Sequence, residues 1–249
     1  MRVKTILIIT SLFISFCSFA FAGEKPAIDA AISDSSRPAE HIERDGGRQP
    51  AEVLKLAKIK PGQSVAEIAS GGGYYTALLS RLLGVDGTVY AVDPQLIFEA
   101  FPNAREGFQK YIESDPRDNV IYSIQRLDEF KVPESLDHIF MVLYYHDTYW
   151  TGENREQMNQ RFYDALKPGG YYFVLDHSAK TGSGQEVTQT LHRMDEALLA
   201  PEVLGAGFKL VGQFDLLRNS EDPLDVSVFD AVWRGKTDRF IYLFQKPEQ

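Results

Sequence analysis

Cysteine is almost absent from this chain of 249 residues, because Cys17 is the only one. It lies in an N-terminal segment that we expect to be removed, so the mature protein would contain no thiol. Disulfide bonds, thiolate catalysis and metal sites built on cysteine are therefore excluded for the mature chain. No linker or internal repeat is visible, and the remaining length suits one domain with a full hydrophobic core.

Basic residues are also scarce, since 26 lysines and arginines stand against 35 aspartates and glutamates. Loss of the N-terminal segment would remove two basic residues and no acid, which leaves 24 against 35 and a net charge of −11. Nucleic-acid phosphates require basic protein surface. A nucleic acid is therefore not an expected partner.

The N-terminal segment has the pattern of a secretory signal peptide. Two basic residues precede an apolar run from residue 6 to about residue 21, and Ala20-Phe21-Ala22 has the small-x-small form of a cleavage site. We predict a signal peptide over residues 1–22 and an exported, periplasmic protein with no stable membrane span after cleavage. The alternatives are an uncleaved anchor, for which the run is barely long enough, and a lipoprotein, which the bulky Phe16 before Cys17 disfavours.

The rest of the chain alternates apolar strands with helices. Strands are predicted over 64–69, 88–92, 120–124, 137–143, 171–175, 208–216 and 240–245, and helices over 28–43, 50–57, 74–83, 95–112 with a break near Pro102, 153–166 and 186–199. This alternation predicts a doubly wound, seven-stranded, mostly parallel sheet in three α/β/α layers. No helix separates the last two strands, so we expect an antiparallel pair at the sheet edge.

Residues 218–238 do not fit this alternation. The segment contains Pro223, Gly235 and five acids, but also several valines, a phenylalanine and a tryptophan. A loop of this length inside a compact domain is usually functional or disordered. Its apolar content predicts a folded flap, and we expect the acidic run 221–225 to be a solvated loop.

The stretch VAEIASGGGYYT at residues 65–76 ends a predicted strand in three consecutive glycines. Glycines let the backbone turn sharply and approach a ligand closely. Asp93 follows the next strand, twenty residues after Gly73, which is the spacing at which an acid accepts hydrogen bonds from both hydroxyls of a ribose. The pattern indicates a nucleoside ligand. The alternative is that Asp93 only caps the helix after Pro94.

Taken together, these motifs resemble the class I S-adenosylmethionine-dependent methyltransferases over residues 50–246. The matching segments are VAEIASGGGYYTALLSRLLG, GTVYAVDP, RLDEF, LDHIFMVLYYHD and LKPGGYYFVLDHS. The resemblance implies S-adenosylmethionine as cofactor, a Rossmann-like domain over residues 50–249 and an N-terminal arm over residues 23–49 that covers the pocket. The LKPGG turn argues against a nicotinamide-binding fold, in which a small residue would also replace Thr76.

The resemblance implies cofactor-binding roles for Glu67, Gly71, Gly73, Asp93 and Asp128. Glu67 would organise the glycine loop and meet the methionine amino group, and the two glycines would bring backbone close to the methionine moiety. Asp93 would bind the ribose and Asp128 the adenine amino group, although Asp128 could equally be a turn residue. Ala69 stands where the family has its first glycine, and its methyl group is expected to narrow the loop.

Histidines follow two central strands of the predicted sheet. His146 and His177 are candidate general bases that would deprotonate a hydroxyl or amine before methyl transfer. The alternative is a divalent metal held by these histidines with Asp147 and Asp176, and we favour the metal-free base.

The chain is also similar to a group of exported predicted methyltransferases with an arginine-rich arm and a late His-Arg pair, here His192-Arg193. Residues expected to bind the substrate are Arg44, Arg48, Tyr145, Asp176 and His192. Pairing of Arg44 and Arg48 with local acids is the alternative for those two. We predict a methyltransferase acting on a small molecule; the alternative is an exported binding protein, or a degenerate methyltransferase fold, that holds another ligand.

Overall fold

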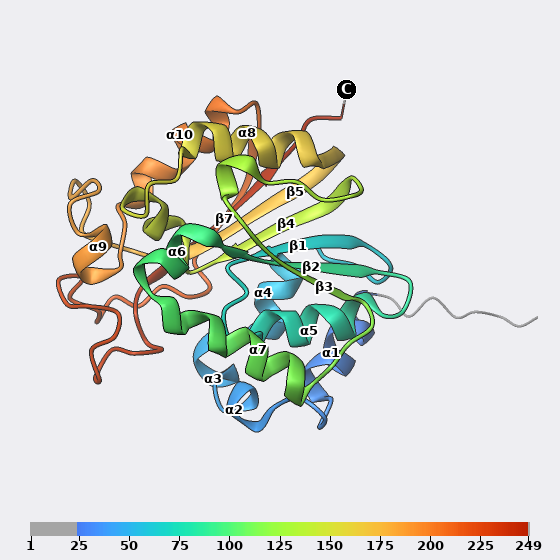
Figure 1. The fold of residues 1–249 in the computed structure, drawn as a ribbon. Helices are drawn as coiled ribbons and strands as arrows, with labels where there is room; N and C mark the ends of the chain where they lie inside the picture. Colours follow the sequence, from blue (N-terminus) through green and yellow to red (C-terminus); the bar gives the residue numbers. More distant parts are fainter. Residues whose placement is uncertain (1–23, 249) are drawn as a thin grey trace, which may run out of the picture.

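The computed structural model describes residues 24–248, and the predicted signal peptide lies outside these residues. Seven strands form one sheet in the order β3-β2-β1-β4-β5-β7-β6 (Figure 1). The strands are β1 (Ser64–Ile68), β2 (Thr88–Pro94), β3 (Val120–Gln125), β4 (Leu136–Val142), β5 (Leu166–His177), β6 (Lys209–Phe214) and β7 (Arg239–Gln245). Strand β7 runs antiparallel to both β5 and β6, whereas the pairs among β1 to β5 are parallel.

The doubly wound, mostly parallel sheet is therefore confirmed, with one refinement. The antiparallel strand β7 is inserted between β5 and β6, so that β6 and not β7 forms the edge. Strand order reverses between β1 and β4, and in sheets of this kind ligands bind beyond the carboxyl ends of the strands at that reversal.

Helices cover both faces of the sheet, in agreement with the predicted three layers (Figure 1). They are α1 (Glu24–Ser33), α2 (Ala39–Ile42), α3 (Asp45–Arg48), α4 (Pro50–Leu56), α5 (Tyr74–Leu83), α6 (Gln95–Ala100), α7 (Arg105–Ser114), α8 (Arg155–Ala165), α9 (Thr188–Leu191) and α10 (Leu199–Gly205). Short 3₁₀ turns are η1 (Pro102–Ala104), η2 (Leu127–Glu129), η3 (Tyr145–Tyr149) and η4 (Glu196–Leu198). Among residues 24–248, no helix has the length and apolar character that crossing a bilayer requires.

The two faces of the sheet make separate hydrophobic cores. Along β5, Phe173 and Leu175 pack in the core formed with α1, α4 and α5, while Tyr172 and Val174 pack in the core formed with α8 and α10. This follows from the two-residue period of a strand, which sends successive side chains to opposite faces. Burial on both faces holds the carboxyl ends of the central strands in place.

Two predicted helices were wrong. The helix over 28–43 is interrupted after Ser33, because the Asp34 carboxylate accepts a hydrogen bond from the Ser36 backbone at 2.8 Å and Pro38 follows. The helix over 186–199 shrinks to the single turn of α9. It ends where His192 adopts φ of +53°, and Met194 beyond it pairs with Ser178 in an isolated β-bridge.

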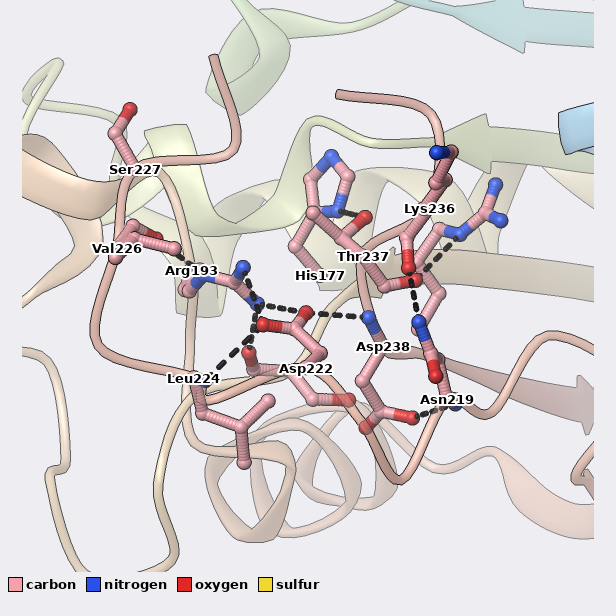
Figure 2. A network of polar contacts seen from close by, with 12 residues as sticks. His177, Arg193, Asn219, Asp222, Leu224, Val226, Ser227, Lys236, Thr237 and Asp238 are labelled. Atoms are coloured by element: carbon pink, nitrogen blue, oxygen red, sulfur yellow. Dashed lines mark hydrogen bonds and ion pairs between the residues drawn. The ribbon is translucent and has the colours of Figure 1, made fainter. Parts of the chain in front are cut away.

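Residues 218–238 form the predicted folded flap, which contains no helix or strand and lies against the end of β5. Arg193 holds it with a bidentate ion pair to Asp222 (2.9 and 3.0 Å), and both side chains are fully buried (Figure 2). The expectation of a solvated acidic run was therefore wrong for Asp222, although Glu221 and Asp225 are exposed. A buried guanidinium requires a charged partner, and the sequence does not show which acid meets it.

Candidate active site

The glycine loop, residues 69–73, leaves β1 in a conformation that requires positive φ angles. Ala69, Gly71 and Gly73 have φ of +61°, +55° and +75°. A Cβ on Gly73 would lie 2.2 Å from the Tyr111 ring of α7, so only glycine fits there. Within the described chain, by contrast, no atom lies within 4 Å of a Cβ built on Gly72. The loop is thus tightly packed at its end and open at its middle.

Asp93 lies at the end of β2 and is bound to this loop. Its Oδ1 accepts hydrogen bonds from the Ser70 hydroxyl at 2.8 Å and the Gly71 amide at 2.9 Å, and its Oδ2 accepts one from the Tyr122 hydroxyl at 3.0 Å. Burial raises the pKa of the carboxyl, and the hydrogen bonds oppose that rise. The carboxylate therefore connects the end of β2 to the glycine loop that follows β1. A nucleoside at this edge of the sheet would contact both.

These residues can accommodate a nucleoside, with one constraint. A carboxylate offers about four lone-pair sites, and three of those on Asp93 are taken by Ser70, Gly71 and Tyr122. One site remains for a ribose hydroxyl, and a second becomes free if the Tyr122 hydroxyl moves. Gly71 and Gly72 carry no side chain; a Cβ built on Gly72 would meet no described atom within 4 Å, and one on Gly71 only the Ala69 carbonyl oxygen at 3.9 Å. No side chain of these two residues therefore obstructs a ligand.

Glu67 and Asp128 flank this region but are held by the protein. Glu67 is buried in β1 and accepts a hydrogen bond from the Thr76 hydroxyl at 2.5 Å, and burial raises the pKa of its carboxyl to about 8. Asp128 forms a bidentate pair with Arg126 and accepts a weaker bond from the Asn154 amide at 3.3 Å. Through these contacts Glu67 connects β1 to α5, and Asp128 connects the segment between β3 and β4 to the residue before α8.

Part of the N-terminal arm, residues 34–49, packs against the glycine loop. Arg37 binds Asp45 through two hydrogen bonds of 2.8 Å, and Asp45 also accepts one from the Tyr74 hydroxyl at 2.6 Å. His41 Nε2 lies 2.9 Å from the Gly72 carbonyl oxygen. The arm therefore covers the loop through contacts with its backbone and with the first residue of α5.

Arg44 and Arg48 project from the arm into a cavity of about 670 Å³. Within residues 24–248 neither arginine has an ion-pair partner, and both stack over the Tyr74 ring, at 5.3 and 4.4 Å from its centroid. Burial and the neighbouring charge of Arg48 lower the pKa of Arg44 to about 10. The cavity is lined by five cations, Arg44, Arg48, Arg234, Lys236 and Arg239, and by a single acid, Glu43.

We call this space the cationic cavity. Three of its five cations, Arg234, Lys236 and Arg239, come from the flap and the start of β7 and were not among the predicted site residues. The signal for them was present, because RGKTDR at residues 234–239 is a basic cluster in an acidic chain. A protein of negative net charge that gathers five cations around one cavity selects for an anion.

A second cavity, of about 440 Å³, adjoins the first and shares Leu143, His177, Val228 and Phe229 with it. It is otherwise lined by Ile97, Phe101, His146, Asp147 and His192. Leu143, at the end of β4, has φ of +58°. Non-glycine residues in this conformation are strained and tend to occur at functional sites.

His177 lies at the junction of the two cavities, at the end of β5. Its Nδ1 is 2.8 Å from the Thr237 hydroxyl (Figure 2), and its Nε2 has no hydrogen bond within the described residues. Burial and nearby cations lower the pKa of the imidazole well below its usual value. If Nδ1–H donates to Thr237, then Nε2 carries a free lone pair and can accept a proton.

His146 is arranged differently. Its Nδ1 is 2.7 Å from Asp176, its Nε2 is 3.1 Å from Asp147, and Asp147 Oδ1 is also 3.1 Å from His192 Nδ1. Burial opposes the charged form, but the two carboxylates raise the pKa of His146 to about 10. Both of its nitrogens are engaged, so that of the two predicted bases only His177 has a free ring nitrogen.

Two predicted substrate residues lie away from the cavities. Tyr145 is fully buried, with its hydroxyl bonded to Glu202 and Asn159. Asp176 is also fully buried and binds His146 and the backbone of His177. We therefore remove Tyr145 from the substrate set and assign Asp176 a positioning role, because a side chain with no accessible surface cannot contact a substrate.

The model of the family described as protein-L-isoaspartate(D-aspartate) O-methyltransferase matches residues 48–122. This region comprises α4, β1, the glycine loop, β2 and the chain up to β3, and it is less than half of the chain. It contains Asp93 and Tyr122 but none of the residues of β4, β5 or the flap that line the two cavities.

Solved methyltransferase structures have the same fold. An S-adenosylmethionine-dependent methyltransferase from Aquifex aeolicus matches with a TM-score of 0.57 and 19% identity, over 78% of this chain and 88% of its own. One from Mesorhizobium loti matches with a TM-score of 0.58 and 12% identity, over 81% of this chain and 99% of its own. Aeropyrum pernix fibrillarin, solved with natively bound S-adenosyl-L-methionine, matches with a TM-score of 0.51 and 13% identity, over 81% of this chain and 76% of its own.

Proposed function

We propose that this protein, which has the fold of the class I methyltransferases, transfers a methyl group from S-adenosylmethionine to a small anionic molecule. The observation that carries the proposal is the glycine loop bonded to Asp93 at the reversal of strand order. The family model matches this region, and it is the part of such sheets at which a nucleoside binds.

The cofactor, when bound, supplies an electrophilic methyl group on a sulfonium. Gly71 and Gly72 offer a backbone cradle without side chains. Asp93 offers a carboxylate oxygen to a ribose hydroxyl, and Ser70 and the Gly71 amide hold that carboxylate in place. Glu67 supports the loop from β1 through Thr76.

The acceptor is proposed to bind in the cationic cavity. Its carboxylate or phosphate group would meet Arg44 and Arg48, whose guanidinium groups have no ion-pair partner among residues 24–248. Charge-assisted hydrogen bonds from arginine are directional as well as strong, so they would fix the orientation of the acceptor. Holding an acceptor in line is the main way in which such a site accelerates transfer.

His177 is proposed to remove the proton from the acceptor hydroxyl or amine. It lines both cavities, and Thr237 holds its ring through Nδ1. A neutral imidazole with a free Nε2 is the form that general base catalysis requires. The acceptor chemistry of the matched family is not carried over, because that match ends at Tyr122.

Binding of S-adenosylhomocysteine, measured by calorimetry on the mature protein, tests the cofactor assignment. We expect saturable one-site binding. Asp93→Asn should weaken it at least roughly tenfold, because one charge-assisted hydrogen bond is lost. Tyr122→Phe should strengthen it several-fold, because it frees Asp93 Oδ2. If folded protein gives no heat of binding with S-adenosylhomocysteine at millimolar concentration, the methyltransferase proposal is refuted.

A separate titration tests the acceptor class. Benzoate, added at low ionic strength without cofactor, is expected to bind, and Arg44→Gln combined with Arg48→Gln should weaken it by roughly tenfold or more. Lys209→Gln, which removes an exposed cation on β6 outside the cavity, is the matched control and should have no effect. Equal affinity in all three proteins contradicts an anionic acceptor.

The two titrations also separate the proposed enzyme from its alternative. A protein that binds benzoate but not S-adenosylhomocysteine is an anion-binding protein on a methyltransferase fold. We further propose that the protein is exported, on the basis of the N-terminal sequence. Fractionation of the native cells with an antibody tests this, and full-length protein in the cytoplasm would refute it.

A further inference from the structure

Three side chains at the edge of the smaller cavity have the geometry of a metal site. His146 Nε2 and His192 Nδ1 each lie 3.1 Å from the same atom, Asp147 Oδ1, and the ligand atoms of the three residues are all within 4.8 Å of one another. Two ligands each about 2.1 Å from one ion lie about 3.0 to 3.4 Å apart in octahedral or tetrahedral geometry. The two spacings to Asp147 Oδ1 therefore match those of ligands around one ion.

We propose that His146 Nε2, His192 Nδ1 and a carboxylate oxygen of Asp147 bind a divalent transition-metal ion. Two imidazoles and one carboxylate suit Zn²⁺, and the same set with open positions also suits Fe²⁺. All-oxygen ligand sets suit Mg²⁺ and Ca²⁺ better. The donor set thus differs from a carboxylate-rich magnesium site.

The surroundings of His146 support this assignment. Metal-bound histidines usually donate their other ring nitrogen to a carboxylate, which fixes the ring and its tautomer. Here Asp176, which is fully buried, lies 2.7 Å from His146 Nδ1, and it also accepts the His146 backbone amide at 2.8 Å. Because Asp176 holds Nδ1, the Nε2 atom is directed toward Asp147.

The third ligand is held in a strained conformation. His192 has φ of +53°, a region that non-glycine residues seldom adopt, and it ends α9. Its ring stands almost perpendicular to that of His146, with centroids 5.5 Å apart. In this conformation Nδ1 lies 3.1 Å from Asp147 Oδ1.

The site also has an open side. His146, Asp147 and His192 line the smaller cavity together with the apolar residues Ile97, Phe101 and Phe229. An ion with three protein ligands keeps coordination positions free for water or for an oxygen of a bound molecule. His177 lines the same cavity, so an ion here would lie beside the proposed base and the cationic cavity.

A hydrogen-bond network without metal is the competing explanation. Asp147 Oδ1 also accepts a bond from Trp150 Nε1 at 2.9 Å, so the cluster is satisfied without an ion. The two explanations differ in affinity for metal. Only a site built for an ion binds Zn²⁺ tightly, in a 1:1 ratio and through both histidines.

The experiment titrates Zn²⁺ into tag-free mature protein by calorimetry and repeats it with Co²⁺, whose absorption spectrum reports ligand number. We expect one Zn²⁺ with a dissociation constant in the micromolar range or below. His192→Asn, chosen because asparagine tolerates the same positive φ, should weaken binding by roughly 100-fold. Asp176→Asn should weaken it by about 10- to 100-fold through loss of ring orientation.

His138→Gln is the control, since His138 is buried at the opposite end of β4 and makes no contact with the cluster. It should leave Zn²⁺ affinity unchanged. Failure of the unmodified protein to bind at 100 µM Zn²⁺, or equal binding by all four proteins, would overturn the proposal. S-adenosylhomocysteine binding, measured on the same samples, reports the cofactor site independently.

Discussion

Asp222→Ala is expected to lower the free energy of unfolding by about 3–5 kcal/mol, because it leaves the buried Arg193 guanidinium without a counter-charge. Asp222 accepts hydrogen bonds from two guanidinium nitrogens of Arg193. It also accepts them from the backbone amides of Leu224 and Asp238, at 3.0 and 2.6 Å (Figure 2). Arg193 also donates to the Ser178 and Val226 carbonyls. One substitution thus removes four hydrogen bonds at a buried site.

Chemical denaturation provides the measurement, and the chain supplies its own control. Asp225→Ala removes the other ion-paired acid of the same run, but both it and its partner Lys180 are exposed, so little or no loss of stability is expected. Arg193→Met combined with Asp222→Ala should cost less than the sum of the single changes, because no charge remains buried. Equal losses for Asp222→Ala and Asp225→Ala would refute the buried-pair explanation.

The Arg193–Asp222 pair also has a functional consequence. Asp238, whose amide binds Asp222, follows Thr237, and Thr237 holds the ring of His177. In Asp222→Ala the flap is therefore expected to lose the orientation of Thr237 and of the cations Arg234 and Lys236. Benzoate affinity should fall together with stability, while S-adenosylhomocysteine affinity should fall less, since within the described residues no hydrogen bond joins the glycine loop to the flap.

The fold class and the pairing of the glycine loop with Asp93 could be predicted because they depend on short-range patterns, whereas the insertion of β7 between β5 and β6 was not predicted. Gly73 has φ of +75°, which local backbone geometry reserves largely for glycine, and the twenty-residue spacing from Gly73 to Asp93 follows from one strand–helix–strand unit. Ala69 illustrates the same locality. Its φ of +61° is a conformation that favours glycine, and an alanine there costs roughly 1 kcal/mol of strain.

The acceptor half could not be predicted to the same depth, because its contacts are long-range. Asp222 and Arg193 are 29 residues apart, and nothing in the acidic run distinguishes Asp222 from its exposed neighbours. Beside the glycine loop, the bond from Tyr122 to Asp93 was not predicted either, because it crosses the β2–β3 pair. In the acceptor half, Arg239 joins the cavity only because β7 inserts beside β5. Tyr145 was misassigned for the same reason, since its strand-end position did not reveal that its ring turns into the core.

Gly73→Ala is expected to lower the free energy of unfolding by about 2–5 kcal/mol, from the left-handed backbone and from the overlap with Tyr111. A Cβ at residue 73 would lie 2.2 to 2.8 Å from three atoms of that ring, which projects from α7 and is buried in a small core with a residue of α5. The loop must shift to relieve the contact, and the Gly71 amide would move away from Asp93. We therefore also expect S-adenosylhomocysteine affinity to fall by roughly 100-fold or more.

Gly72→Ala is the matched control, since its φ is not positive and the space beside it is open. Its free energy of unfolding should lie within about 1 kcal/mol of that of the unmodified protein. Gly73→Ala combined with Tyr111→Ala should cost less than the sum of the two single changes, because the smaller side chain removes the overlap but not the φ strain. If Gly72→Ala and Gly73→Ala are equally stable, then steric contact with Tyr111 is not what requires glycine at residue 73. In that case glycine would be needed at residue 73 only for contact with the ligand. Calorimetry on Gly73→Ala would then show a lower affinity for S-adenosylhomocysteine with an unchanged free energy of unfolding.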